Sequence, residues 1–322
     1  MPSHSTLPRR LRRLLATTAL ACAALAVTTV PAGARAPYPV PYGLGGGLPH
    51  YFDQAAPAGA NDWACKPSAE HPEPVILLHG FTASMAADWA TLAPLLANNG
   101  YCVFAFNYGY ETTLPAPLNQ LSGMASMIDS ATNELAPFVD RVLAATGAER
   151  VDFVGHSMGT VMPRWYIKYL GGAEKVAKSI NLTPLNNGTN ANFGATAGAM
   201  LDRIGLWDDF QRAAGDAGYA GAVQLTTGSD YLNRVNADVA YDPAIQYTFI
   251  MTRYDEIVWP YTSGFGPVAP NVTNIVVQDQ CPLSLFEHNG ASSDPVVAQH
   301  VLNALDPENR APVNCFGRPR NG

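Results

Sequence analysis

The sequence predicts an α/β protein with a central, mostly parallel sheet and helices on both of its faces. Apolar runs of strand length alternate with longer segments of helical periodicity along most of the chain, as in a series of strand–helix–strand units. The apolar runs are continuous, which is expected for strands buried on both faces. One run leads directly into a Gly-x-Ser-x-Gly motif and then into a helical segment, which places that serine at the carboxyl edge of the sheet.

The individual elements follow in order along the chain. The run Val75–Leu78 is wholly apolar and stops at His79-Gly80. The segment 84–96 then repeats large apolar residues at helical spacing, and Asn98-Asn99-Gly100 ends it. Further helices are expected at residues 121–145, 158–170 and 295–305. Further strands are expected at residues 101–106, 151–154, 178–182, 247–251 and 274–277.

Residues 1–34 have the three parts of an export signal. Arginines between positions 9 and 13 precede an apolar stretch over residues 14–30, and Ala32-Gly33-Ala34 is a small-x-small cleavage site. Cleavage is expected after Ala34, with Ala36 as the alternative. A membrane anchor is the competing interpretation, but this stretch has only 17 residues and is rich in weakly apolar alanine and threonine. We therefore expect a secreted, extracellular protein.

The charge balance argues against nucleic acid as a partner. The chain has 19 basic and 26 acidic residues, and without residues 1–34 the balance is 15 against 26, a net charge of −11. Binding to phosphates by electrostatics requires the opposite sign. Hydrophobic residues make up 48% of the chain and charged residues 14%, so the composition is that of a folded protein.

One domain is expected after a short arm. Residues 35–60 are rich in proline and glycine and are predicted to form an extended arm, whereas residues 61–322 show one α/β pattern. Neither a linker nor an internal repeat divides that pattern, and we expect a monomer.

A helical insertion is expected within residues 190–241. Its apolar residues recur at helical spacing, namely Leu201, Ile204, Trp207 and Phe210. An amphipathic helix inserted between strands is either a mobile lid over an apolar site or a static cap, and both interpretations stay open.

The cysteines agree with export. Apart from Cys22 in the export signal there are four, and an even number in an exported chain indicates two disulfides. Four cysteines allow three pairings; we favour Cys65–Cys102 and Cys281–Cys315 because each pair brackets one local unit. The sequence has neither a Cys-x-x-Cys motif nor a His/Cys cluster, so we expect no metal and no cofactor.

The candidate nucleophile is Ser157, in Gly155-His156-Ser157-Met158-Gly159. An attacking serine must project from a sharp strand-to-helix turn, and glycines two residues to either side relieve the crowding there. An ordinary serine in a glycine-rich turn is the alternative, but here the motif follows a strand and opens a helix. Acyl transfer also needs two backbone N–H groups aimed at the developing oxyanion. We expect them at Met158 and at Phe81, with His79 ordering the loop that contains Phe81.

A serine nucleophile needs a base, and the base needs a carboxylate that orients it. In the fold that carries such a turn, the chain order is nucleophile, acid, base, which leaves His288 and His300 as bases. His300 lies inside the last predicted helix, so we favour His288, which lies in a loop after the last strand. Asp255 follows the strand at 247–251 and is the favoured acid, with Glu256 as the neighbouring alternative.

Five segments carry a resemblance to a known family. They are Asn61-Asp62-Trp63-Ala64-Cys65, His79-Gly80-Phe81, Gly155-His156-Ser157-Met158-Gly159, Tyr254-Asp255-Glu256-Ile257-Val258 and Glu287-His288-Asn289-Gly290. In combination they resemble the secreted lipases and esterases of actinobacteria, which belong to the α/β-hydrolase superfamily and are close to the class 2 lipases. The resemblance extends from about Asn61 to about Cys315. It implies Ser157, Asp255 and His288 as the triad and the amides of Phe81 and Met158 as the oxyanion hole.

The sequence departs from the family's pattern in two places. Thr160 stands where such enzymes often have another glycine, and Leu185-Asn186-Asn187 replaces a usual Ser-His. These changes leave the triad candidates in place and concern the acyl and alcohol pockets.

These observations predict a secreted serine carboxylic-ester hydrolase, foremost a triacylglycerol lipase or esterase. Its substrate would be a lipid or other ester, with transient contact to a lipid interface. An amidase or peptidase, an acyltransferase and a hydrolase of polyester or cutin use the same triad and remain alternatives. A non-catalytic binding protein on the same fold would be expected to lack a member of the triad.

Overall fold

The computed structural model of the protein describes residues 36–43, 46–191 and 194–322. Residues 37–322 group into one compact unit. The expected export signal at residues 1–34, including Cys22, lies outside the described residues.

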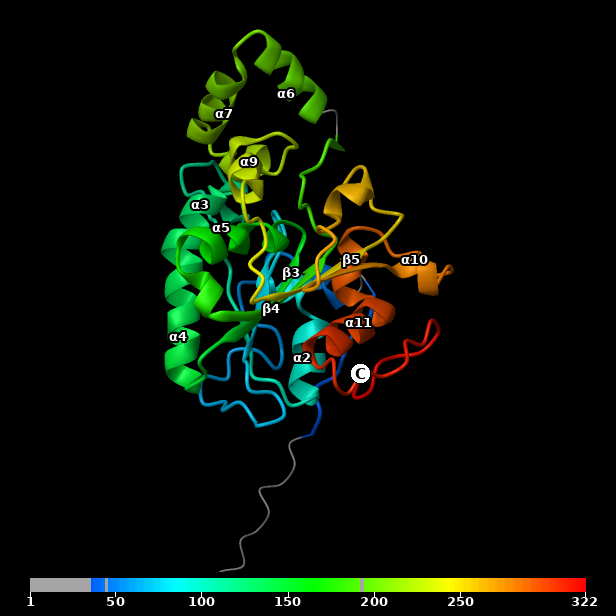
Figure 1. Ribbon diagram of the computed structural model, residues 1–322. Coiled ribbons are helices and arrows are strands. Elements are labelled where there is room, and N and C mark those ends of the chain that lie inside the picture. The colour runs from blue at the N-terminus through cyan, green and yellow to red at the C-terminus, as the bar shows by residue number, and fades with distance from the viewer. Residues whose placement is uncertain (1–35, 44–45, 192–193) are drawn as a thin grey trace, which may run out of the picture. The chain divides into compact units, whose positions relative to one another are not determined.

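A six-stranded parallel sheet forms the centre of this unit (Figure 1). Its strands, in chain order, are β1 (Val75–Leu78), β2 (Val103–Ala105), β3 (Val151–His156), β4 (Val176–Leu182), β5 (Gln246–Met251) and β6 (Val272–Val276). They lie in the order β2-β1-β3-β4-β5-β6, and every neighbouring pair is parallel. The direction of winding reverses at β1, between β2 and β3. Ligand sites in open α/β sheets form at the carboxyl ends of strands beside such a reversal.

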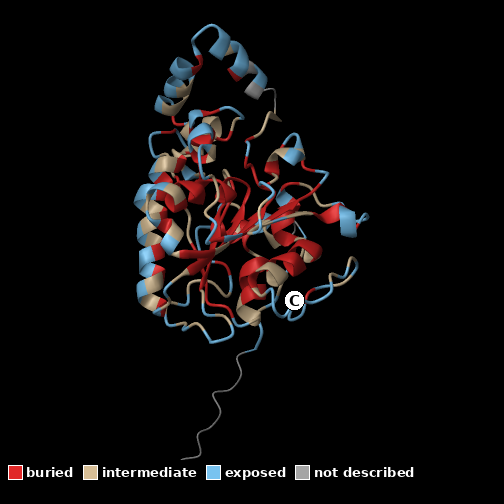
Figure 2. Cartoon of the chain, in the orientation of Figure 1, coloured by how far each residue is buried: buried red, intermediate tan, exposed pale blue. Residues whose placement is uncertain are grey.

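Helices cover both faces of the sheet. One face carries α3 (Met127–Asp129), the π-helical turn η4 (Ser130–Leu135), α4 (Ala136–Thr146) and α5 (Met162–Tyr169). The other face carries α2 (Leu92–Asn98) and α11 (Pro295–Leu305). Side chains alternate along β1, so that Ile76 packs in the core with α3–α5 and Leu77 in the core with α2 and α11. Figure 2 shows both cores as buried segments around the strands.

The remaining short elements connect these layers. Those in the first half of the chain are η2 (Leu48–His50), α1 (Met85–Asp88), η3 (Leu118–Gln120), η5 (Ser157–Thr160) and η6 (Gly172–Glu174). Those after β5 are η8 (Tyr261–Gly264), α10 (Val277–Gln280) and η9 (Asn289–Ser293). None of the described helices is both long and apolar enough to span a bilayer.

The expected helix at 84–96 is wrong, because the structure has two helices there, α1 and α2. Local periodicity continues across the break, but tertiary hydrogen bonds interrupt it. The Asp88 carboxylate at the end of α1 accepts from the Gly80 N–H at 2.7 Å, and the Thr91 hydroxyl before α2 donates to the Pro41 carbonyl. The first bond ties α1 to the loop after β1, and the second ties the start of α2 to the N-terminal arm.

The expected helix at 121–145 also differs, since α3 begins only at Met127. Ser126 caps that helix by accepting from the Ile128 N–H. Gly123 has a φ of +78° and lies against Phe81 and Met158, where a Cβ atom would come within 3.2 Å of the Phe81 Cα. This loop therefore packs against the candidate oxyanion residues. The helix expected at 158–170 is divided into η5 and α5.

The insertion between β4 and β5 contains four helices rather than one. They are α6 (Gly194–Arg203), α7 (Trp207–Asp216), α8 (Ala220–Gln224) and α9 (Asp230–Asn236). Gly205, with a φ of +74°, turns the chain between α6 and α7, so the expected apolar repeat is split between them. Trp207 packs on Gly198 of α6, and most of both helices is exposed (Figure 2).

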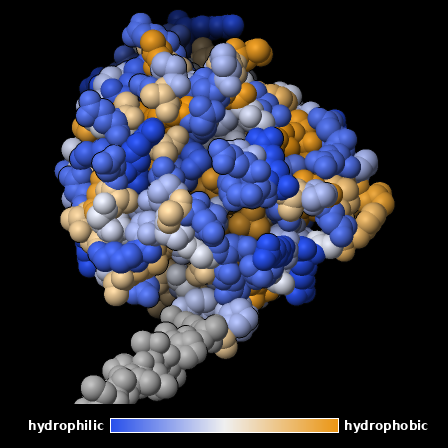
Figure 3. All heavy atoms as spheres, turned by 60° about the horizontal axis from the view of Figure 1, so that its bottom comes forward, coloured by the Kyte–Doolittle hydropathy of each residue, from blue (hydrophilic) through white to orange (hydrophobic). Residues whose placement is uncertain are grey.

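Two disulfides join distant parts of the chain. Cys65–Cys102 attaches the segment before β1 to the start of β2, and Cys281–Cys315 attaches the C-terminal tail to the end of α10. These are the two pairs favoured from the sequence. The face of the molecule in Figure 3 is mainly hydrophilic, with small separated apolar groups.

Candidate active site

Ser157 lies on a sharp turn directly after β3. Its φ of +53° is in the left-handed region, which residues other than glycine rarely adopt and which occurs at functional sites. Both glycines of the motif are required by close backbone contacts. A Cβ on Gly155 would lie 2.2 Å from the Gly159 carbonyl oxygen, and a Cβ on Gly159 would lie 2.0 Å from the Leu78 carbonyl oxygen. The motif thus fits β3 and η5 tightly against the end of β1.

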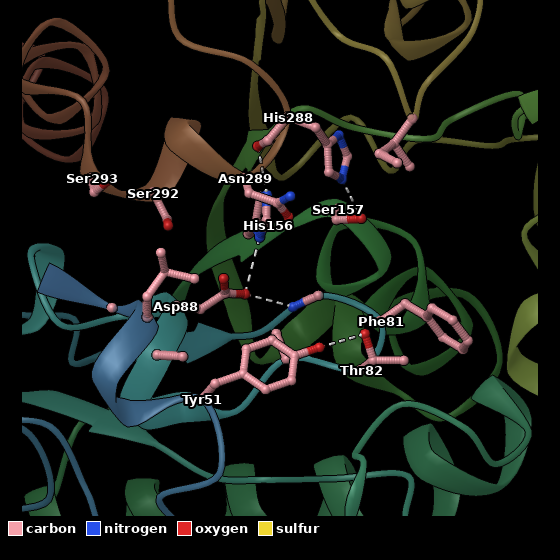
Figure 4. Close-up of a pocket in the computed structure, with 16 residues that line it drawn as sticks. Tyr51, Phe81, Thr82, Asp88, His156, Ser157, His288, Asn289, Ser292 and Ser293 are labelled. Carbon is pink, nitrogen blue, oxygen red and sulfur yellow. Dashed lines mark hydrogen bonds and ion pairs between the residues drawn. The ribbon is translucent and has the colours of Figure 1, made fainter. Parts of the chain in front are cut away.

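The structure brings Ser157, His288 and Asp255 together at this edge. Nε2 of His288 lies 2.8 Å from the Ser157 hydroxyl oxygen, and Nδ1 of His288 lies 3.0 Å from each carboxylate oxygen of Asp255. All three residues are buried. Figure 4 shows the His288 ring directed at Ser157 from the loop before η9. A hydroxyl, an imidazole and a carboxylate in this order can transfer the hydroxyl proton to the ring while the carboxylate orients it.

Backbone amides fix the Asp255 carboxylate. One of its oxygens accepts from the N–H groups of Ile257 at 3.0 Å and Val258 at 2.7 Å. The carboxylate is thus oriented by a turn after β5 and presents both oxygens to His288.

The two alternatives from the sequence lie elsewhere. The Glu256 carboxylate accepts from the backbone N–H of His288 at 3.2 Å, so it contacts the backbone of that residue. His300 is buried in α11, away from the hydrogen-bonded chain that contains Ser157.

Phe81 and Met158 flank the nucleophile. Phe81 lines the same cavity as Ser157, and Met158 follows Ser157 and is fully buried. Among the described residues, no backbone acceptor takes the N–H of Phe81. The loop after Phe81 is held by the Thr82 N–H, which donates to the Ser122 carbonyl at 2.8 Å.

His79 is neutral and fixes the loop that contains Phe81. Its Nδ1 donates to the Gly80 carbonyl at 2.8 Å, and its Nε2 accepts from the Tyr108 N–H at 3.2 Å. Burial lowers the pKa of His79 to about 4. The ring also stacks on Tyr108, with centroids 4.1 Å apart.

His156, next to the nucleophile, carries a positive charge. Its Nδ1 lies 2.9 Å from the Asp88 carboxylate and its Nε2 lies 3.0 Å from the His288 carbonyl oxygen. Both partners can only accept, so both ring nitrogens must donate, and the ring is an imidazolium. Burial alone would lower the pKa of His156, but the charge and hydrogen bond of Asp88 outweigh it and raise that pKa.

Asp88 is the matching anion. Burial alone would raise its pKa, but His156 and the Gly80 N–H hold it below its ordinary value. The pair therefore links three parts of the site through Gly80, His156 and the His288 carbonyl. Neither residue was singled out from the sequence, where Asp88 is one polar position in a helical segment. The only feature of the sequence that could have pointed to His156 is that an ionisable residue fills the position directly before the candidate serine.

A cavity of about 370 Å³ opens beside Ser157, within the size range of small-molecule sites. Its wall includes Phe81 and His288, and also Tyr51 from the expected N-terminal arm (Figure 4). The described residues contain no group of three His, Cys, Asp or Glu side chains placed to hold a metal ion.

Comparison with known proteins identifies the family. Residues 72–301, more than half of the chain, match the family model described as lipase (class 2). The protein therefore belongs to this family.

Solved lipase structures share the fold. Aspergillus fumigatus lipase B is similar with a TM-score of 0.55 at 16% identity, over 81% of this chain and 57% of that one. Bacillus licheniformis lipase BlEst2 in its mature form is similar with a TM-score of 0.50 at 14% identity, over 74% of this chain and 94% of that one. A structure reported for LipS and LipT, two metagenome-derived lipolytic enzymes, is similar with a TM-score of 0.51 at 15% identity, over 79% of this chain and 100% of that one. The chain thus spans little more than half the length of the Aspergillus lipase.

Identities this low support the fold alone, which is that of an α/β hydrolase. The family match adds the class, and the protein is a carboxylic ester hydrolase of the α/β-hydrolase type.

Proposed function

We propose that the protein is a secreted serine esterase of the lipase type, which hydrolyses lipid esters such as triacylglycerols. The observation that carries this proposal is the hydrogen-bonded chain from Ser157 through His288 to Asp255, with 2.8 Å between the hydroxyl and the ring. The class 2 lipase match over residues 72–301 favours esters over amides as substrates.

The proposed reaction has two steps. Ser157 Oγ attacks the ester carbonyl carbon while His288 Nε2 takes the hydroxyl proton and Asp255 stabilises the resulting imidazolium. The N–H groups of Phe81 and Met158 bind the oxyanion. Collapse of the tetrahedral intermediate expels the alcohol, which receives the proton from His288. A water molecule then gives its proton to His288 and attacks the acyl-enzyme, which releases the acid and restores the Ser157 hydroxyl.

Contact with a lipid surface is proposed for α6 and α7. These helices and the turn between them expose a set of large apolar side chains, namely Met200, Ile204, Leu206 and Phe210. Exposed apolar groups on a projecting helical pair suit transient insertion into a lipid interface. A mobile lid and a static cap would both present this surface.

Secretion is proposed on two grounds. Residues 1–34 have the composition of an export signal, and the two disulfides are typical of proteins that fold in an oxidising compartment.

The proposed function is tested with p-nitrophenyl esters of short, medium and long acyl chains and with a p-nitroanilide. Ser157→Ala should lose at least about 10³-fold in kcat on the esters, whereas Ser68→Ala, at an exposed position, should retain wild-type rates. Equal rates in Ser157→Ala and wild type would contradict the mechanism. Faster hydrolysis of the anilide than of every ester would make the protein an amidase.

A further inference from the structure

Residues 46–52, here named the N-terminal strap, form one wall of the cavity beside Ser157. Gly47, Leu48 and Tyr51 line that cavity together with the nucleophile and His288. The strap precedes the segment that matches the family model, which begins at residue 72. This part of the cavity wall therefore comes from the N-terminal arm, which lies before the matched segment.

Hydrogen bonds hold the strap and the residues before it against two parts of the site, the loop after Phe81 and η9. The Tyr51 hydroxyl donates to Thr82 Oγ1 at 2.9 Å, and the Ser84 hydroxyl donates to the His50 carbonyl at 3.1 Å. Both partners lie just after Phe81. Just before the strap, the Gly43 N–H donates to the Ser293 carbonyl at 3.0 Å in η9.

Close packing on α1 completes this attachment. A Cβ on Gly47 would lie 2.3 Å from the Ala87 carbonyl oxygen, so the strap backbone touches α1 without an intervening side chain. The strap cannot move away from α1 without breaking its bonds to the oxyanion loop.

The position of the cavity identifies the part of the substrate that it holds. His288 must return its proton to the leaving alcohol oxygen, so the alcohol lies on the His288 side of the scissile bond. The cavity is bordered by His288 and by Asn289, Ser292 and Ser293, which follow it. Its end at His288 therefore lies on the alcohol side of Ser157, and its other end lies against the oxyanion loop, where Gly80, Phe81 and Thr82 line it.

We propose that the N-terminal strap, through Leu48 and Tyr51, limits the size of the alcohol that the enzyme accepts. The proposal rests on the proposed esterase function and adds a selectivity element to it. Leu48 and Tyr51 provide an apolar wall opposite the polar groups of Asn289, Ser292 and Ser293. The cavity thus suits an alcohol that is slender at the carbon next to the ester oxygen, as at the primary positions of a triacylglycerol. The wall disfavours an alcohol that is bulky at that carbon, as in a cyclohexyl ester.

The test uses two substrate series and titration of the released acid. One series keeps butyrate as the acyl group and varies the alcohol from ethanol to n-butanol to cyclohexanol. The other keeps ethanol and varies the acyl group from acetate to butyrate to octanoate. The kcat/KM values report the acylation step, in which the alcohol is still attached.

Two substitutions of opposite size address Leu48, which is 64% exposed and so is replaceable without disturbing the core. Leu48→Ala should raise the cyclohexyl-to-ethyl ratio of kcat/KM by about three- to tenfold, and Leu48→Trp should lower it by a similar factor. The octanoate-to-acetate ratio should change by less than about twofold in both variants. Val268→Ala is the control, because Val268 is an exposed apolar residue outside the cavity wall, and its ratios should equal those of wild type.

The proposal is overturned if neither Leu48 variant changes the alcohol ratio, or if only the acyl ratio changes. It is also overturned if Val268→Ala changes the alcohol ratio as much as Leu48→Ala does. These results leave the proposed esterase function intact, which fails only if the wild type is inactive or Ser157→Ala is fully active.

Discussion

The imidazolium of His156 and the carboxylate of Asp88 form a buried ion pair, 2.9 Å apart, beneath the candidate site. Asp88 also binds the Gly80 N–H at 2.7 Å, and His156 also binds the His288 carbonyl at 3.0 Å. The pair therefore connects the oxyanion loop, the nucleophile turn and the loop of the base. Because both groups are buried and oppositely charged, the loss of one charge would leave the other buried without compensation.

Asp88→Asn should destabilise the protein and slow the reaction. The free energy of unfolding should fall by about 3–5 kcal/mol, which is typical when one partner of a buried pair is removed. The kcat should fall more than KM changes, because the substitution displaces the groups that act in the transition state. Urea unfolding and ester hydrolysis measure the two effects. Asp209→Asn, in an exposed pair with Arg212, should have little effect, and an unchanged urea midpoint in Asp88→Asn would contradict the ion-pair interpretation.

The two neighbouring carboxylates after β5 should have very different effects on catalysis. Asp255→Asn should reduce kcat by about 10⁴-fold, because an amide no longer holds the His288 ring in the required tautomer. Glu256→Gln should reduce kcat by less than about tenfold, since Glu256 contacts only the His288 backbone N–H. Initial rates on a p-nitrophenyl ester decide between them, and a larger loss in Glu256→Gln would reverse the assignment.

The contribution of His79 to stability should decrease as the pH falls from about 6.5 to about 4. Its pKa is about 4 in the folded protein and 6.5 ordinarily, so in this window the unfolded chain binds a proton that the folded protein does not. The difference between the two pKa values corresponds to about 3 kcal/mol. The raised pKa of His156 acts only above pH 6.5, where stability is lost as the pH rises. The raised pKa of buried Asp152, about 7, acts with the opposite sign over the same window. The His79 contribution is therefore measured as the difference in the free energy of unfolding between wild type and His79→Gln in urea at several pH values. A difference that does not fall with the pH below 6.5 would contradict the neutral His79.

The exposed apolar surface of α6 and α7 should matter for lipid aggregates and not for dissolved esters. Ile204→Ser combined with Phe210→Ser should reduce hydrolysis of emulsified triolein several-fold and leave dissolved p-nitrophenyl butyrate within about twofold. Val239→Ser is the control, because Val239 is as exposed as Ile204, at 66%, and lies outside these helices. Equal effects on the two substrates would argue against an interfacial role.

The sequence predicted the sheet and the triad candidates that the structure brings together, because both depend on short local patterns. Apolar runs marked the strands, and Gly155 and Gly159 marked the turn at Ser157. The fixed order of nucleophile, acid and base along the chain in this fold then favoured Asp255 as the acid and His288 as the base.

The features that the sequence analysis missed depend on contacts between distant segments. Asp88 is at a helical position where a carboxylate would ordinarily face water, and only Gly80 and His156 explain why it is buried. The break between α1 and α2 also depends on contacts with distant segments. The helical periodicity of the sequence continues through Trp89 without interruption, so local pattern alone does not predict the break. The strap was predicted to be part of an extended arm, because proline and glycine content indicates local chain stiffness. It does not indicate where the chain packs.

The most direct test of the central claim is the chemical identification of the nucleophile. Diethyl p-nitrophenyl phosphate transfers its phosphoryl group to an activated serine hydroxyl and releases p-nitrophenolate. Peptide mass spectrometry should find one modified residue, Ser157, and activity should disappear in proportion to that modification. Complete inactivation with an unmodified Ser157, or full activity after its modification, would contradict the account.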